Sequence, residues 1–256
     1  MNFPFPFMIS FFMGRRMRKG GTLMIDIHNH LLPLIDEGAT HVEETIRMAR
    51  RAAAEEVRRI IATPYATHAT AEEVQLIVAE LNVLLAQRQI PVLVYPGQQT
   101  RLTLGLRDAV NQGHVLTLAD TAYLLIDCPD DPLPVYTEEI MTGLIEDGYL
   151  PILAQPEDNA ELLEHPERLV QLIEKGVRCQ LATHSILGHH GEEKKLFCQR
   201  AVQKGWVHFI ASNAKKATDH LHLMPAYQQI EQWSGANVVD RLKWNAEQIL
   251  VSPPIV

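Results

Sequence analysis

The chain has 256 residues, of which 46% are hydrophobic, and this is enough to bury the core of one large α/β domain. Its formal net charge of −8 at pH 7 excludes a general nucleic-acid binder, because neutralising phosphates requires clustered Lys and Arg. The three cysteines, Cys128, Cys179 and Cys198, have neither CxxC nor zinc-ligand spacing. We expect them to be reduced thiols in a cytoplasmic protein.

The first 23 residues differ in character from the rest of the chain, because an apolar aromatic run precedes the basic stretch GRRMRKGG. A secretory signal has the opposite order, and the apolar run is too short and too rich in proline to span a bilayer. We expect residues 1–23 to be a disordered extension outside the fold, with Met24 as the natural first residue. A weak anchor at a membrane surface is the alternative.

Seven short apolar runs predict strands, at residues 23–28, 58–63, 91–97, 122–127, 150–155, 177–182 and 207–212. Amphipathic stretches predict helices at 42–56, 70–87, 165–176, 192–205 and 224–233, and Thr70 with Glu73 predicts a capping box. Strands that alternate with helices imply parallel pairing through right-handed crossovers. Residues 24–256 are therefore predicted to form a single domain, a distorted (β/α)7 barrel related to the TIM barrel.

Functional side chains of such a barrel lie at the carboxyl ends of its strands. His28 and His30 end the first predicted strand. An HxH pattern on an extended segment points both imidazoles to one face, at a spacing that suits one metal ion. The alternative is that both are polar residues at the barrel mouth, hydrogen-bonded to neighbours or water.

Six sequence blocks occur in the order and spacing of a known family: MIDIHNHLLPLIDEGA, IIATPY, YPGQQTR, YLLIDCP, LPILAQPED and VHFIASNAKKA. From Met24 to about Leu250 the chain resembles the PHP-type (polymerase and histidinol phosphatase) metal-dependent protein-tyrosine phosphatases of Gram-positive capsule and exopolysaccharide clusters. The resemblance implies a PHP-like barrel with a trinuclear metal site, typically manganese, that activates water and clamps a phosphoryl group. It also implies a tyrosine kinase or another phosphotyrosine-containing protein as the partner.

The ligand pattern of this family is only partly present in the chain. The resemblance retains His28 and His30 as ligands and places acidic residues at two further ligand positions, Glu37 and Asp127. The remaining five ligand positions are replaced, by Tyr65, Gln99, Gln155, Asn213 and Lys215. Asp158 stands where the resemblance would place an arginine that grips phosphate.

These replacements predict a site rebuilt to be stable without metal, so no cofactor is expected. Amide carbonyls bind transition metals weakly, and Lys215 should be a cation at pH 7. Gln99 removes the bridging carboxylate, and Asp158 sets a negative charge where a phosphate needs a positive one. We expect Lys215 to take the place of a metal, in a partly buried ion pair with Glu37 and in contact with Tyr65.

Three functions follow from this pattern. The first is a pseudophosphatase with a binding or regulatory role in exopolysaccharide tyrosine-kinase signalling. The second is an active manganese-dependent tyrosine phosphatase with a reduced site of one or two ions, and the third is different hydrolase chemistry on the same barrel. Neither a membrane span nor nucleic-acid binding is expected. Residual activity, oligomeric state and a relocated site that uses His68, His184, His189 or His190 stay open.

Overall fold

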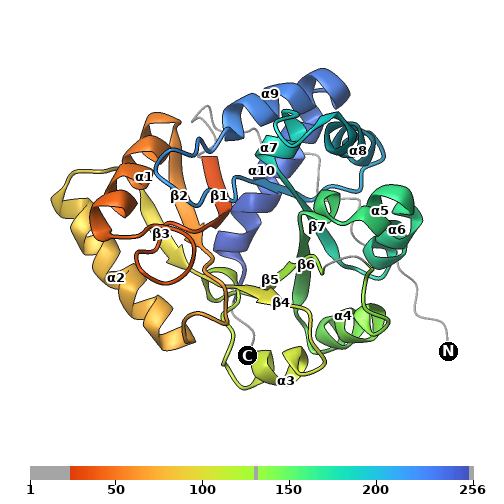
Figure 1. Cartoon of the computed structure of the whole chain (residues 1–256), viewed down its shortest axis with the longest axis horizontal. Coiled ribbons are helices and arrows are strands. Elements are labelled where there is room, and N and C mark those ends of the chain that lie inside the picture. Colours follow the sequence, from red (N-terminus) through yellow and green to blue (C-terminus); the bar gives the residue numbers. More distant parts are fainter. Residues whose placement is uncertain (1–23, 130–131, 254–256) are drawn as a thin grey trace, which may run out of the picture.

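Parallel strands form the centre of the molecule, and helices surround them (Figure 1). A computed structural model describes residues 24–129 and 132–253, so the expected extension at 1–23 lies outside the described residues. The strands are β1 (Met24–Asn29), β2 (Val57–Ala62), β3 (Leu93–Pro96), β4 (Gln99–Arg101), β5 (Tyr123–Asp127), β6 (Leu150–Ala154), β7 (Arg178–Ala182) and β8 (Phe209–Ala211).

The strands follow one another around a closed, distorted barrel. They pair in the orders β1-β2-β3 and β4-β5-β6-β7-β8, and every pair is parallel. Two isolated parallel bridges, Asn29 with Ala214 and Tyr65 with Gln99, join the two sheets to each other. The predicted barrel architecture is therefore confirmed.

The strand predicted at 91–97 contains β3, which pairs with β2, and the short strand β4, which pairs with β5, follows it at Gln99–Arg101. The two strands are separated at Gly97. Only glycine fits closely against Ile61 here, because a Cβ atom would lie 2.9 Å from the Ile61 side chain. The buried side chain of Gln98 then donates to the carbonyl of Ala69 at 2.7 Å and accepts from the N–H of Leu116 at 2.9 Å. β4 was not predicted, because three residues are too few to show a period.

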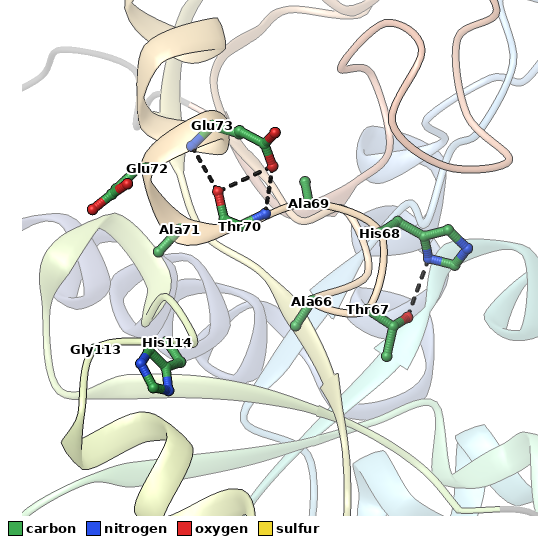
Figure 2. A pocket seen from close by; sticks show the side chains of 10 residues that line it. All are labelled: Ala66, Thr67, His68, Ala69, Thr70, Ala71, Glu72, Glu73, Gly113 and His114. Atoms are coloured by element: carbon green, nitrogen blue, oxygen red, sulfur yellow. Dashed lines mark hydrogen bonds between the residues drawn. The ribbon is translucent and has the colours of Figure 1, made fainter.

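Five helices match the predicted ones: α1 (Val42–Ala54), α2 (Ala71–Gln87), α6 (Pro166–Glu174), α8 (Glu192–Gln203) and α9 (Leu223–Ser234). Unpredicted are α3 (Leu106–Asn111), α4 (Thr137–Glu146), α5 (Ala160–Glu164), α7 (Thr183–Ile186), α10 (Ala236–Val251) and the 3₁₀ turns η1 (Leu118–Asp120) and η2 (Pro156–Asp158). The capping box of α2 is present, with Thr70 and Glu73 each accepting the other's backbone N–H (Figure 2).

The hydrophobic core has two parts. The larger part packs the strands against the outer helices. The smaller part includes Ile25, Leu125 and Phe209 from the strands, together with Ala246 and Ile249 of α10. Within the described residues, no helix combines the length and the apolar character that crossing a membrane requires.

Candidate functional site

The two histidines of the HxH pattern lie at the carboxyl end of β1. The pairing of β1 with β2 shifts register between Asp26 and Asn29, and a bulge of this kind re-aims the side chains beside it. His28 and His30 are fully buried, and their ring centroids lie 5.5 Å apart. The two imidazoles are therefore neighbours, as their spacing predicted.

His28 is held between two glutamines, with Nδ1 at 3.1 Å from Gln180 Oε1 and Nε2 at 3.1 Å from Gln99 Oε1. Burial, followed by the charge of His30, lowers the pKa of His28 to about 3, so its imidazole is neutral and has only one N–H to donate. Gln99 donates its own amide N–H to Asp127 Oδ1 at 2.7 Å, and its oxygen therefore faces His28.

The proton of His28 accordingly belongs on Nε2, where it is donated to Gln99. Nδ1 must then accept, which requires the Gln180 amide to be flipped, with its nitrogen and not Oε1 toward His28. This orientation also gives a partner to that nitrogen, which is buried and otherwise has none. Neither ring nitrogen of His28 keeps a lone pair for a metal.

His30 is placed differently. Its Nδ1 lies 2.6 Å from Asp36 Oδ2, and its Nε2 is buried with no hydrogen-bond partner among the described residues. Burial acts to raise the pKa of Asp36, but the hydrogen bond and charge of His30 outweigh it, so this pKa lies below its ordinary value. A carboxylate that orients a histidine in this way is typical of metal ligands. Asp36 was missed in the sequence, where only its neighbour Glu37 was singled out.

Lys215 occupies the position expected from the sequence. Its Nζ lies 2.5 Å from Glu37 Oε1 and 3.5 Å from the hydroxyl of Tyr65, which donates to the same carboxylate at 3.3 Å. The hydrogen bond from Lys215 holds the pKa of Glu37 below its ordinary value. The pair is more open than expected, because the Glu37 side chain is 58% exposed and that of Lys215 28%.

The other replaced positions are joined in a second chain of hydrogen bonds. Asn213 donates to Gln155 Oε1 at 2.7 Å, and Gln155 donates to Asp158 Oδ2 at 3.2 Å. The other oxygen of Asp158 accepts from Lys194 at 2.6 Å. Gln155 and Asn213 both adopt positive φ, a conformation that Asn adopts more readily than most residues and Gln does not. Asp158 is therefore neutralised by a lysine of α8 and does not face the site as an unpaired charge.

Glu157 is a buried acid that the sequence did not single out. One oxygen accepts from the N–H of Ala182 at 2.7 Å, and the other has no hydrogen-bond partner among the described residues. Burial raises the pKa of Glu157 to about 8, although the bond from Ala182 acts against this. The group is therefore largely protonated at neutral pH.

The candidate residues for a relocated site lie outside these networks. The exposed His68 contacts Thr67 (Figure 2). Its ring centroid lies 5.8 Å from that of Tyr65. His184, His189 and His190 gather after β7. In the described part of the chain, no hydrogen bond or ring contact joins any of these three to His28 or His30.

Two hollows open near the barrel mouth. One, of about 350 Å³, is lined by Asp127, the exposed Arg101 and the residues Pro129 and Pro132. The other, of about 490 Å³, lies between the start of α2 and His114 (Figure 2). The first is the one that adjoins the hydrogen-bonded network, through Asp127.

A closed parallel barrel with histidines and carboxylates at the ends of its strands defines the class of the protein as a distorted α/β barrel with a polar site at its mouth. A crystal structure of histidinol phosphate phosphatase from Lactococcus lactis shares this fold, with a TM-score of 0.55 and 11% identity over 83% of this chain and 95% of that one.

The family model for capsular polysaccharide synthesis proteins of the CpsB/CapC type matches residues 24–251, and the chain belongs to this family. It is 37% identical to the tyrosine-protein phosphatase YwqE of Bacillus subtilis, over 89% of this chain and 91% of YwqE. It is 31% identical to the putative tyrosine-protein phosphatase CapC of Staphylococcus aureus, over 77% of this chain and 78% of CapC.

The fold of the whole chain also matches a solved structure of this kind. A crystal structure from work on YwqE of Bacillus subtilis and CpsB of Streptococcus pneumoniae, both metal-dependent tyrosine phosphatases, superposes on this chain with a TM-score of 0.87. The identity is 35%, over 91% of this chain and 96% of the other. The expected fold and family are thus confirmed, and both extend over nearly the whole described barrel.

The donor set at the barrel mouth does not fit a trinuclear metal centre. Both nitrogens of His28 are engaged by amides, and an ammonium group lies against Glu37. Gln155 and Asn213 offer neutral amides that already bond to each other. Three divalent ions require anionic ligands and free imidazoles together. Of the family's ligand positions, His30 alone combines an orienting carboxylate with a buried nitrogen that has no described partner.

Proposed function

We propose that this chain acts in the tyrosine-phosphate control of capsular polysaccharide synthesis as a binding protein with little or no phosphatase activity. Its partner is a tyrosine kinase or another phosphotyrosine-containing protein. The observation that carries the proposal is the Lys215 ammonium at 2.5 Å from Glu37, because this cation competes with a metal ion for the same carboxylate. The bond between Gln99 and His28 supports it in the same way.

A second candidate is an active phosphatase with a reduced metal site, and the comparisons favour it. Both relatives described above are named as tyrosine-protein phosphatases. The available Nε2 of His30 supplies one ligand, and Asp127 and Glu37 supply carboxylates. This candidate requires Lys215 to leave Glu37 when metal binds.

Hydrolysis of a phosphotyrosine peptide with added manganese separates the two candidates. For the first candidate we expect turnover near background, because an oxyanion-stabilising group alone contributes about a hundredfold or more. A chain with Tyr65→His, Gln99→Glu, Gln155→His, Asp158→Arg, Asn213→Asp and Lys215→His should gain manganese-dependent turnover. The gain should disappear when His28→Ala is added. Strong manganese-dependent turnover in the natural chain, abolished by His28→Ala or His30→Ala, would establish the second candidate.

Binding is measured separately, with a fluorescently labelled phosphotyrosine peptide and its unphosphorylated counterpart. Arg101 lies at the wall of the hollow beside Asp127, and a guanidinium group binds a phosphate in a bidentate manner. Arg101→Ala should therefore weaken binding of the phosphorylated peptide, whereas Arg59→Ala, on the strand β2, should not. Equal affinity for the two peptides would contradict the binding role.

A further inference from the structure

Three histidines converge outside the hydrogen-bonded network of the barrel mouth. They are His184 at the start of α7, His189 in the loop that follows, and His222 immediately before α9. One ring nitrogen from each can be chosen so that all three lie within 4.8 Å of one another. We infer that His184, His189 and His222 form a binding site for one divalent transition-metal ion of the zinc type.

The three rings have the mutual arrangement that a single ion requires. Their centroids lie 5.5 Å apart for His184 and His189, and 5.1 Å from His222 to each of the other two. The interplanar angles lie between 65° and 78°, so the rings meet edge to face and not as a stack. Tetrahedral zinc has Zn–N distances of about 2.0 Å, which places ligand nitrogens about 3.3 Å apart. Small ring rotations therefore close the site.

The backbone fixes the three positions before any ion binds. The hydroxyl of Thr183 donates to the carbonyl of Leu221 at 2.8 Å, and these two residues directly precede His184 and His222. The N–H of His189 donates to the carbonyl of His184 at 2.9 Å. Thr183 and Leu221 are both buried. This hydrogen bond therefore connects two segments, 38 residues apart in sequence, next to His184 and His222.

His222 has a conformation that is held from outside the triad. Its φ of 53° lies in the left-handed region, which few non-glycine residues adopt. The carboxylate of Glu55 accepts its backbone N–H at 2.9 Å and binds the ring of His220 through its other oxygen. The ring of His222 faces His184 and His189, while the ring of His220 stacks on it with centroids 5.2 Å apart and has a nitrogen bonded to Glu55.

The ring nitrogens of the triad are available as ligands. In the described part of the chain, no hydrogen bond engages a ring nitrogen of His184, His189 or His222, whereas His190 is bonded to Ser185 and His220 to Glu55. Burial, followed by the neighbouring histidines, lowers the pKa of His184, and burial likewise lowers that of His222. Both rings are therefore neutral at pH 7, as metal ligands must be.

Three imidazoles select a borderline ion such as Zn²⁺, Co²⁺, Ni²⁺ or Cu²⁺ over Mg²⁺ or Ca²⁺, which require oxygen ligands. His189 is exposed, so the fourth position of a tetrahedral ion opens to water. The site would be distinct from the family's ligand positions, since none of its three residues is among them.

The test is titration of the full chain with Co²⁺, followed by the d–d absorption bands of a tetrahedral ion, and with Zn²⁺ by calorimetry. We expect one ion per chain. Loss of an outer-shell partner alone typically weakens metal binding by about 10- to 100-fold, so loss of a ligand should weaken it at least as much. His184→Asn, His189→Asn and His222→Asn should each do so and abolish the tetrahedral bands.

Two controls locate the ion. His165→Asn changes an exposed histidine far from the cluster in sequence and should leave the bands unchanged. The double variant His28→Asn, His30→Asn should also leave them unchanged, which separates this site from a metal at the barrel mouth. Absence of Co²⁺ and Zn²⁺ binding by the natural chain would overturn the inference. The inference would also be overturned if the bands survive in the double variant His184→Asn, His222→Asn. It would be overturned as well if they vanish in the double variant His28→Asn, His30→Asn.

Discussion

At the scale of single residues, the barrel mouth is a set of polar groups that satisfy one another. Gln99 accepts from His28 and donates to Asp127, and Asn213 bonds to Gln155. A buried polar group without a partner costs about 1–3 kcal/mol, so each replacement is tolerable because neighbouring groups bond to it. This satisfaction is incomplete at His30 Nε2 and at Asn213 Oδ1, which are buried and have no hydrogen-bond partner among the described residues.

The ion pair of Lys215 with Glu37 should contribute little to stability. Its Glu37 side chain is 58% exposed, and exposed pairs are worth about 0–1 kcal/mol. Lys215→Ala should therefore lower the free energy of unfolding by no more than about 1 kcal/mol in urea denaturation. Lys216→Ala, on the adjacent exposed lysine, is the control. A loss of several kcal/mol would mean that the pair is buried in solution, as the sequence alone suggested.

Glu157 should make stability depend on pH. Its pKa is about 8 in the folded chain against 4.5 for an ordinary glutamate. At a pH between these two pKa values, Glu157 is protonated in the folded state and ionised in the unfolded state. The contribution of Glu157 to the free energy of unfolding therefore falls as pH rises from 5 to 8. The limiting slope is about 1.4 kcal/mol per pH unit.

The measurement is urea unfolding at several pH values between 5 and 8. Glu157→Gln removes the titrating group, so the stability of the natural chain should fall relative to this variant as pH rises. Glu164→Gln, on an exposed side chain of α5, should keep the dependence of the natural chain. Parallel curves for the natural chain and Glu157→Gln would contradict the buried, protonated state of Glu157.

At the scale of elements, local sequence signals account for the helices that were predicted. The capping box of α2 satisfies backbone N–H groups that the first turn leaves without partners. Strand β1 shows the limit of such signals, because its shifted register depends on β2 and not on its own residues. The placement of His28 and His30 is therefore a property of the strand pair.

Thr70→Ala should destabilise the protein by about 1 kcal/mol, because an N-cap hydroxyl typically contributes between 0.5 and 2 kcal/mol. The midpoint of urea unfolding measures this change. Thr67→Ala removes an exposed threonine from the same loop, outside the capping box, and is the matched control. Equal effects of the two substitutions would show that the cap contributes nothing.

At the scale of the whole molecule, the barrel is closed between its first and last strands. The buried carboxylate of Asp26 accepts from the N–H and the hydroxyl of Ser212, at 3.0 and 2.5 Å, and from Asn29 at 2.9 Å. The bonds with Ser212 join residues 186 positions apart. They lie next to the bridge between Asn29 and Ala214 that completes the ring of strands.

Asp26→Ala should be the most destabilising of the substitutions at this closure, because it leaves three buried donors without their acceptor. At about 1–3 kcal/mol for each, the loss should be at least 3 kcal/mol, seen in thermal or urea unfolding. Ser212→Ala removes one of the donors and also leaves the N–H of Ala214 without its acceptor at 3.0 Å, so it should cost about 1–3 kcal/mol, less than Asp26→Ala. The opposite ranking would show that the closure does not depend on Asp26.

The sequence by itself determined the order of the strands, five of the helices and the strand ends that carry the site. This was possible because the periods of buried strands and amphipathic helices are local properties. The pairing of Lys215 with Glu37 followed from the family resemblance, which places both residues at ligand positions of the same site. The family resemblance covered the same residues.

Only the tertiary structure decided which distant groups meet. Gln180 reaches His28 across 152 positions, Asp36 orients His30, and His222 joins His184 and His189 although 33 positions separate it from the nearer one. Such contacts depend on which strands are neighbours and on the direction in which each loop leaves the barrel. Local periodicity carries no information on which strands are neighbours or on loop direction. The contacts of these residues can therefore be identified only from the closed barrel.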